Sequence, residues 1–401
     1  MHKIKAVVVG ASQAGLAMSH ELKRVGVEHV VLERNKIGHG WHERWDSFCL
    51  VTPNWSVQLP GYQYNGDDPD GFMPRDEIVA YLEGYARSFD APVLEGVAVH
   101  AASRNGDGFL IETSADQYRA DSLILATGAF QRPHRPSGSD ALPNRLFLID
   151  LDGYTHPEAL PAGDVLIVGS GQSGCQIAEE LHEAGRRVVL SCGRAPWFLR
   201  RIGDRDFVWW AIESGFFDVK ADDLPKDARL FANVLATGHG GGRDLHLRTL
   251  QALGVTLVGR FLGADEKKAR FANDLAENVQ WGDEKYGQIK KLILNLVEQQ
   301  GLDTLDIADP EPFVADAPDR VDLSTFGTVI FTGGFRPDFR SWLPWPDAFD
   351  DQGFPHQRDG TSTVVDGLHF VGLHFLRKRK SALLYGVGED AGIVADTIAA
   401  Q

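Results

Sequence analysis

The sequence is poor in cysteine, and the cysteines it has are widely spaced. Its 401 residues include only Cys49, Cys175 and Cys192, too few and too far apart for a disulfide framework. Disulfide-stabilised folds are therefore excluded, as are enzymes that use a redox pair of closely spaced cysteines. A reducing, cytoplasmic setting is expected.

The chain also lacks a net positive charge and long apolar runs. With 40 Lys and Arg against 56 Asp and Glu, the formal net charge is −16, which argues against nucleic acid and anionic membranes as main partners. No segment approaches the ~18 uninterrupted apolar residues of a membrane span. Residues 1–9 have a strand-like pattern rather than a signal-peptide layout. The 14 histidines show no metal-ligand spacing, so no metal site is expected.

The overall composition is that of a folded globular protein. Hydrophobic residues make up 43% of the chain and charged residues 24%. A chain of 401 residues exceeds the size of one typical hydrophobic core and therefore predicts two domains.

A strand–helix–strand pattern with a glycine-rich turn opens the chain. The apolar run 5–9 predicts a buried strand, and Gly10-Ala-Ser-Gln-Ala-Gly15 follows it directly. A helix is expected from about Gln13 to Arg24, and a second strand over 27–32 ends in Glu33. This order and spacing predict a dinucleotide-binding unit.

The residue type at each key position of this turn has a physical explanation. Gly10 permits the tight strand-to-helix turn, and Gly15 lets the helix pack close to the strand. Ser12 replaces the middle glycine of the usual pattern but is still small. The helix N-terminus favours the phosphates, and Glu33 can accept hydrogen bonds from an unphosphorylated ribose, as in FAD or NAD.

A second unit of the same kind follows, with one difference. A strand over 164–168 leads into Gly169-Ser-Gly-Gln-Ser-Gly174, a helix from about 172 to 184, and a strand over 187–190. Ser191 stands where Glu33 stands in the first unit, and Arg194 lies three residues on. A hydroxyl and a guanidinium in place of a carboxylate favour the 2′-phosphate of NADPH. A solvated charge at a strand end is the alternative for Arg194.

Two later runs indicate how the units are joined. Leu123-Ile-Leu-Ala-Thr-Gly128 and Val329-Ile-Phe-Thr-Gly-Gly334 resemble the crossover segments of flavoproteins in which one dinucleotide-binding domain is inserted into another. The predicted fold class is therefore α/β, with two nested Rossmann-like domains. Residues 1–155 are expected to begin the FAD-binding domain, 156–325 to form the inserted NADPH-binding domain, and 326–401 to complete the first domain.

Further segments narrow the resemblance to the bacterial flavin-containing monooxygenase family, near the plant indole-pyruvate monooxygenases. These segments are Gly40-Trp41, Arg44-Trp-Asp-Ser47, Thr52-Pro53, Leu59-Pro-Gly61, Phe335-Arg-Pro-Asp-Phe339, Gly367 to Leu373, and Ser381 to Gly388. The resemblance covers nearly the whole chain.

The resemblance implies two sets of cofactor-binding residues. The FAD set is Gly10, Ser12, Gln13, Gly15, Glu33, Arg34, Trp41, Trp45, Val99, Ala126, Thr127, Gly128 and Gly388, and the NADPH set is Gly169, Gly171, Gln172, Ser173, Gly174, Ser191 and Arg194. The helix that opens near Gly388 is expected to point its positive end at the flavin.

The linker before the second unit departs from the family pattern. The family has a histidine there, in a pattern such as His-Ser-Ser-x-Tyr, whereas this chain reads Asp150-Leu-Asp-Gly-Tyr154. Only Tyr154 is kept, and it is one candidate catalytic residue. Asn54 is the other, because the animal enzymes carry an active-site asparagine nearby.

Two more segments allow alternative interpretations. Arg377-Lys-Arg-Lys380 either binds an anion or forms a solvated loop. The apolar stretch 207–217 predicts a buried helix, an aromatic substrate pocket or a subunit contact, which leaves a homodimer open.

The resemblance implies an NADPH-dependent FAD monooxygenase. It would insert one oxygen atom of O2 into a small organic substrate through a C4a-(hydro)peroxyflavin. Two alternatives stay open: an NADPH oxidase or reductase that inserts no oxygen, favoured by the missing linker histidine, and a flavoprotein redox sensor.

Overall fold

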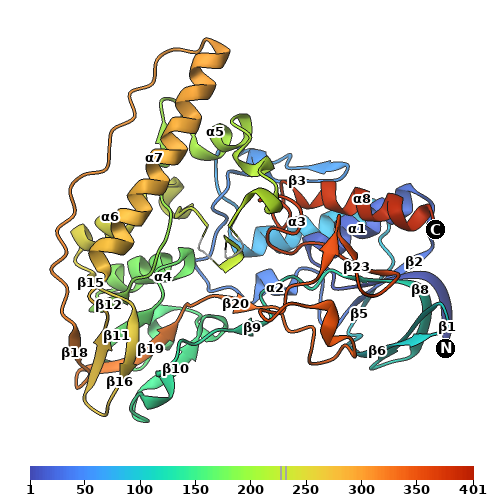
Figure 1. The fold of residues 1–401 in the computed structure, drawn as a ribbon, viewed down its shortest axis with the longest axis horizontal. Helices are drawn as coiled ribbons and strands as arrows, with labels where there is room; N and C mark the ends of the chain where they lie inside the picture. The colour runs from blue at the N-terminus through green and yellow to red at the C-terminus, as the bar shows by residue number, and fades with distance from the viewer. Residues whose placement is uncertain (226–227, 231–232) are drawn as a thin grey trace.

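Two sheets, one mixed and one entirely parallel, lie side by side with helices packed against them in the computed structural model (Figure 1). The structure describes residues 1–225, 228–230 and 233–401. The first sheet contains the chain's N-terminal strands and the last strand before the C-terminal helix. The second is built from the middle of the chain. The predicted α/β class with two dinucleotide-binding units is confirmed.

The first sheet has five parallel strands at its centre and antiparallel strands at its margins. Its order is β21-β22-β23-β8-β1-β2-β5, with β7 also on β8 and β6 on β7. The strands are β1 (His2–Val9), β2 (His29–Glu33), β5 (Val93–Glu95), β6 (Val99–Asn105), β7 (Gly108–Thr113), β8 (Gln117–Leu125), β21 (Gln357–Arg358), β22 (Thr361–Ser362) and β23 (Leu368–Phe370). The apolar runs that end β1 and β8 are buried on both faces, as central parallel strands require.

Helices cover one face of this sheet. They are α1 (Gln13–Arg24), α3 (Arg75–Ser88) and α8 (Val387–Ala399), and α1 and α8 pack side by side (Figure 1). The sequence prediction for α1 agrees with the structure at both ends. The short helix α2 (His39–His42) and the hairpin of β3 (Gln58–Leu59) and β4 (Tyr62–Gln63) complete this side. Phenylalanines pack on the opposite face, among them Phe109, Phe339 and Phe370.

The second sheet is entirely parallel, in the order β10-β19-β11-β12-β15. Its strands are β10 (Phe147–Asp150), β11 (Asp164–Val168), β12 (Val188–Ser191), β15 (Thr256–Val258) and β19 (Phe326–Phe331). Helices α4 (Gln172–Glu183), α5 (Phe207–Glu213), α6 (Leu247–Leu253) and α7 (Leu275–Gln300) belong to this unit, with a small hairpin of β13 (Arg201–Ile202) and β14 (Arg205–Asp206). The far face carries β16 (Phe261–Ala264), β17 (Lys268–Phe271) and β18 (Arg320–Asp322).

The sheet pairing bears on the expected domain boundaries. β10 and β19 pair with each other in the second sheet, although the boundaries 1–155, 156–325 and 326–401 place both in the first domain. We therefore propose that the inserted unit runs from β10 to β19. Just outside it, β9 (Arg132–Pro133) and β20 (Phe335–Arg336) pair antiparallel, so the two connecting segments run together.

The apolar stretch 207–217 forms a helix that is shorter than the stretch itself. α5 ends at Glu213, and Gly215 then takes a left-handed conformation with φ 72°. Phe207 and Trp210 are buried in the core of the second unit, so the buried-helix interpretation holds for this part. Trp209 is only half-buried and stacks under the Arg205 guanidinium at 3.7 Å.

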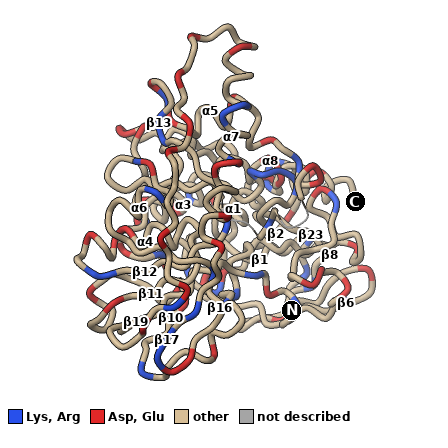
Figure 2. The backbone as a smooth tube through the Cα atoms, turned by 60° about the vertical axis from the view of Figure 1, so that its left-hand side comes forward, with Lys and Arg blue, Asp and Glu red and all other residues tan. Residues whose placement is uncertain are grey.

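The basic segment 377–380 is a strap between the two units rather than a solvated loop. Its backbone bonds to residues 217–221, and Lys378 and Lys380 each bridge Asp218 of the second unit and Glu389 of α8 at 2.7–3.0 Å. Figure 2 shows basic and acidic segments meeting beside α8. The solvated-loop expectation was wrong because four opposite charges converge here.

This strap predicts a specific pH dependence of stability. Burial opposes the ionisation of Glu389, but hydrogen bonds from Lys378 and Lys380 outweigh it and lower its pKa to about 2; the same lysines lower the pKa of Asp218. Because both carboxyls have folded-state pKa values below their unfolded values, their stabilisation is present at neutral pH and is lost as the pH falls from about 4.5 towards 2.

We expect Asp218→Asn to lower the melting temperature at pH 7 by about 2–4 °C, and to have a smaller effect at pH 3. Thermal melting followed by circular dichroism measures both values. Asp107→Asn, in the exposed turn between β6 and β7, is the matched control and should change neither. An equal loss at both pH values for Asp218→Asn would contradict the ionic nature of the strap.

Candidate functional site

The first glycine-rich turn brings the start of α1 against β1 with no room for side chains. Gly10 has φ 102°, and a Cβ atom on it would lie 3.0 Å from the carbonyl oxygen of Ala126. A Cβ on Gly15 would lie 1.7 Å from the carbonyl oxygen of Gly10. Ser12 is the N-cap residue of α1, but its side chain makes no capping bond. The first N–H groups of α1 are therefore free to bind an anion.

Glu33 lies against this turn from the end of the neighbouring strand. Its Oε2 accepts from the backbone N–H of Ala11 at 2.9 Å and its Oε1 from that of Asn35 at 2.9 Å. The carboxylate is half-buried and retains lone pairs for ribose hydroxyls. Arg34 beside it is exposed, and Val99 lies half-buried at the start of β6.

A chain of side-chain hydrogen bonds orders the turn. Gln13 Oε1 accepts from Ser12 Oγ at 2.6 Å and from Trp41 Nε1 at 2.9 Å. Its Nε2 reaches the carbonyl oxygen of Ala382 at 3.4 Å, on the segment that leads into α8. The structure thus brings together three residues of the predicted FAD set with the C-terminal part of the chain.

The strand ends beside Gly10 complete this edge of the sheet. Ala126, Thr127 and Gly128 follow β8, and Gly128 has φ 70°. Gly372 follows β23, and a Cβ on it would lie 2.3 Å from the Cβ of Ala14. Gly372 belongs to a segment that carries the family resemblance, and its contact with α1 was not predicted. The carboxyl ends of parallel strands are where such sheets bind ligands.

Gly388 serves packing rather than anion binding. α8 begins at Val387, and a Cβ on Gly388 would lie 2.7 Å from Pro60 of the β3–β4 turn. The first turn of α8 already carries Glu389 and Asp390, which pair with the strap. The helix end is therefore charge-compensated from within the chain, which weakens the expectation that it serves a flavin.

A hollow of about 660 Å³ lies beside the start of α8. Its walls come from the β3–β4 hairpin, α1 and the segment before α8, and the residues that line it include Glu21, Gln58, Pro60, Tyr62, Tyr385 and Gly388.

The second turn repeats the geometry of the first. Gly169 has φ 121°, and its Cβ would lie 2.8 Å from the backbone of Thr332. A Cβ on Gly174 would lie 2.0 Å from the carbonyl oxygen of Gly169. Gly171 is the N-cap residue of α4, so this helix also begins without a side-chain cap, and Ser173 in its first turn is half-buried.

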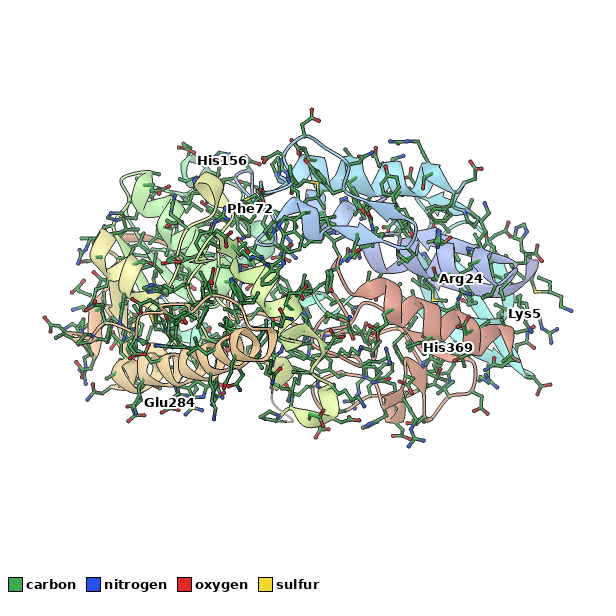
Figure 3. The ribbon with its side chains drawn as sticks, turned by 90° about the horizontal axis from the view of Figure 1, so that it is seen from above. Lys5, Arg24, Phe72, His156, Glu284 and His369 are labelled. Carbon is green, nitrogen blue, oxygen red and sulfur yellow. The ribbon has the colours of Figure 1, made fainter. Side chains whose placement is uncertain are left out.

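A segment of the second unit crosses the start of α4. Gln172 Nε2 donates to the carbonyl oxygen of Ala236 at 2.7 Å, and Gln176 does so at 3.3 Å. The glycine-rich stretch 238–242 then reaches Phe72 of the first unit, which Figure 3 places between the two halves. Sequence analysis missed this segment, whose repeated glycines were its only signal.

Ser191 and Arg194 differ in their availability to a ligand. Ser191 is buried, and its Oγ donates to the carbonyl oxygen of Gly259 at 3.0 Å. Its hydroxyl is therefore engaged within the protein, contrary to the expectation that it binds a phosphate. Arg194 is exposed, and no carboxylate of the described residues forms an ion pair with it.

Asn54 has a bracing position rather than a catalytic one. It is 3% exposed, its Nδ2 donates to the carbonyl oxygen of Asp68 at 2.9 Å, and its Oδ1 accepts from the N–H of Met73 at 2.7 Å. Both ends of the amide are satisfied by the loop that they hold, so Asn54 has no free group for a substrate.

Tyr154 lies in the second unit and shares its partner, Glu180, with Ser47 of the first. Its hydroxyl donates to Glu180 Oε2 at 2.8 Å, and Glu180 Oε1 accepts from Ser47 Oγ at 2.7 Å. Burial, and then the charge of Glu180, raise the pKa of Tyr154, so it stays protonated. Trp45 is 3% exposed and packs with Tyr154 in the core of the second unit, which argues against its expected contact with FAD.

Asp150, which replaces the family histidine, is held by Arg135. The two side chains form a two-pronged pair at 2.7 and 2.8 Å, and the guanidinium lies over the Phe331 ring at 4.6 Å. The linker into the second unit is therefore fixed by an ion pair.

The sequence predicts neither a metal site nor a membrane-spanning helix, and the described part of the chain can be searched for both. Residues 1–225, 228–230 and 233–401 contain no group of His, Cys, Asp and Glu that could hold a metal ion. Among the same residues, no helix combines the length and apolarity needed to cross a membrane.

Three comparisons with known proteins agree with this geometry. The family described as pyridine nucleotide-disulphide oxidoreductase matches residues 7–203. A CzcO-like oxidoreductase of Geobacillus kaustophilus is 32% identical over 99% of both chains. A probable indole-3-pyruvate monooxygenase of Arabidopsis thaliana is 29% identical over 98% of this chain and 86% of its own. A flavin-containing monooxygenase of Stenotrophomonas maltophilia, 20% identical, has the same fold with a TM-score of 0.71 over 100% of this chain and 99% of its own.

The close approach of backbone at Gly15 predicts that flavin binding requires glycine at this position. We expect Gly15→Ala to displace the start of α1 and to lower the flavin content of the purified protein at least tenfold, because the added Cβ meets backbone that cannot move independently. The ratio of absorbance at 450 and 280 nm measures the flavin content. Gly287→Ala is the control: it lies in the middle of α7 with nothing within 4 Å of its Cβ, so it should retain full flavin. Full flavin in Gly15→Ala would contradict the proposed site.

Proposed function

We propose that this chain, which belongs to the family of CzcO-like oxidoreductases, is an NADPH-dependent FAD monooxygenase acting on a small organic substrate. The observation that carries this proposal is the pair of uncapped helix starts, each at the carboxyl edge of its own parallel sheet.

FAD fits the first site. The free N–H groups of α1 suit its diphosphate, and Glu33 suits the unphosphorylated ribose of its adenosine half. The residues that we propose to line the path of the cofactor are Gly10, Ser12, Gln13, Gly15, Glu33, Arg34, Trp41, Val99, Ala126, Thr127 and Gly128. When bound, FAD supplies the chemistry of accepting a hydride and passing electrons to O2.

NADPH fits the second site. The start of α4, with Gly169, Gly171, Gln172, Ser173 and Gly174, would hold its diphosphate, and Arg194 would bind the 2′-phosphate.

The protein's own contribution is to orient the two sites and to exclude water between them. The Tyr154–Glu180–Ser47 hydrogen bonds and the charged strap fix one unit against the other. Oxygen transfer succeeds only while water and loose proton donors are kept away from the reacting atoms. Similarity to the plant monooxygenase supports oxygen insertion as the outcome.

One observation favours an NADPH oxidase or reductase instead. Asp150 occupies the linker position at which the related monooxygenases have histidine, and its carboxylate is already paired with Arg135 and offers no hydrogen-bond donor to NADP⁺. In that case the same two sites would pass electrons to an acceptor without inserting oxygen.

The availability of Arg194 predicts coenzyme preference. We expect Arg194→Ala to raise the KM for NADPH roughly ten- to hundredfold, because that is the loss of affinity expected when one charge-assisted hydrogen bond is removed. The KM for NADH should stay nearly unchanged. Steady-state oxidation of both coenzymes measures this, and Arg194→Lys should lie between the wild type and the alanine variant. An equal loss with NADH would mean that Arg194 does not bind the phosphate.

The proposed reaction with O2 predicts a transient in rapid kinetics. The enzyme is reduced anaerobically with NADPH, mixed with O2 and followed by full absorbance spectra. We expect a species distinct from oxidised and reduced flavin that is short-lived, so that without substrate much of the NADPH consumed appears as hydrogen peroxide. Direct reoxidation at every pH, with NADP⁺ saturating, would favour the oxidase or reductase. Asp150→His alone is not a clean test because it also breaks the pair with Arg135.

A further inference from the structure

Arg44 is a half-buried cation without a counterion. It follows α2, and its backbone is fixed, because its N–H donates to the carbonyl oxygen of Trp41 and its own carbonyl accepts from Arg75 at 2.8 Å. Its Nε is enclosed and has no hydrogen-bond partner. Among the described residues, no carboxylate lies within ion-pair distance of its guanidinium.

The surroundings of Arg44 do not compensate its charge. The guanidinium stands 5.4 Å from the centre of the Phe130 ring and 5.9 Å from that of Phe48. Burial lowers its pKa, and the nearest acids are too distant to restore it: Glu43 pairs with His39 at 3.0 Å, and Asp152 is exposed. A partly enclosed charge that makes only ring contacts carries a desolvation cost, and proteins ordinarily pair such a group.

A more deeply buried arginine at the junction of the units shows the contrast. Arg200, which is 4% exposed, has Asp206 at 2.8 Å and donates to the carbonyl oxygen of Val51 at 2.7 Å. The charge of Arg200 is thus compensated by a carboxylate, although its Nε and Nη2 also lack a hydrogen-bond partner, whereas Arg44 has no carboxylate at ion-pair distance among the described residues.

A second polar group without a partner lies beside Arg44. His374 stacks edge-on against Phe130 at 4.9 Å, and no hydrogen bond from the described residues reaches its ring. Burial, and then the charge of Arg44, lower its pKa to about 4, so the ring is neutral at pH 7 and can donate one N–H without repelling the arginine.

These residues sit between the two nucleotide sites. Phe130 follows β8, and His374 follows β23 two residues after Gly372, which touches Ala14 of α1. Phe130 also packs on Phe335 of β20, one of the two segments that lead to the second unit, at 5.6 Å. Figure 1 places α2, β9 and β20 together between the two sheets.

We propose that Arg44, assisted by His374, binds an anionic oxygen of a ligand that enters the junction between the two units. The ligand group is a carboxylate or a phosphate, carried either by the organic substrate or by the nicotinamide nucleotide. A guanidinium bonds either group with two parallel N–H donors, and the exposed Phe130 ring offers an apolar surface to the rest of the ligand. The proposal rests on the proposed function, because it names a ligand class for the same junction.

The test is calorimetric titration of the FAD-loaded protein with three probes: sodium benzoate, inorganic phosphate and NADP⁺. We expect Arg44→Gln to weaken the binding of at least one probe roughly ten- to hundredfold, and Arg44→Lys to restore part of it. Flavin content and melting temperature should stay at the wild-type level in both variants. Arg205→Gln, which removes another arginine from an aromatic ring, is the matched control and should bind every probe normally.

The pattern of losses identifies the source of the anion. Weaker benzoate with unchanged NADP⁺ assigns the site to a substrate carboxylate, whereas weaker NADP⁺ assigns it to the nucleotide. Unchanged binding of all three probes in Arg44→Gln, or loss of FAD without any change in probe binding, would overturn the proposal. If Arg44→Gln does not fold, the same titrations on Arg44→Lys decide, because an ammonium cannot make the two-pronged contact. Oxygen chemistry plays no part in these titrations, so a failure to insert oxygen would leave their outcome intact.

Discussion

The missing side chains at Gly15 and Gly174 are the constraint on which the rest of the molecule depends. At both places a helix begins so close to the preceding strand that a Cβ would lie within 2.0 Å of a carbonyl oxygen. This contact directs the uncapped helix start at the carboxyl edge of the sheet, where backbone N–H groups can meet a phosphate. The chain builds this arrangement twice, and the second strand of the unit ends in Glu33 in the first case and in Ser191 in the second.

The second constraint is that the two units are held together at their junction. The chain crosses between the units at β9 and β20, which pair with each other. Side chains from both units then brace the junction: Tyr154 and Ser47 share Glu180, and two lysines share Asp218 and Glu389. Residues that look catalytic by family position, Tyr154 above all, prove to belong to this bracing.

Much of the fold could be predicted from the sequence because its signals are local. The bounds of α1 and β11 follow from the apolar runs and the glycine spacing, and the structure agrees with them. The sheet membership of β10 and β19 could not be predicted, because strand pairing between residues that are about 180 positions apart leaves no local pattern.

The candidate site likewise contains positions that could be predicted from the sequence and positions that could not. Backbone-dependent positions such as Gly10 and Gly169 were found, because a positive φ and a close approach select glycine. Positions that depend on the partner of a side chain were mistaken: the Ser191 hydroxyl bonds to Gly259, the Asn54 amide to its own loop, and the basic segment to Asp218 and Glu389. In the sequence, Arg44 stood out only as part of a segment that carries the family resemblance. The absence of a hydrogen-bond partner at its Nε could be recognised only in the folded structure.

The most direct test of the account is anaerobic reduction of the bound flavin by NADPH deuterated at either face of the nicotinamide C4. If the two sites serve one hydride transfer, flavin bleaching in a stopped-flow instrument should slow several-fold for one of the two deuterated forms and not for the other, because one fixed geometry exposes one face. Equal rates for both, or a flavin that NADPH does not bleach at all, would contradict the claim that the two units act together.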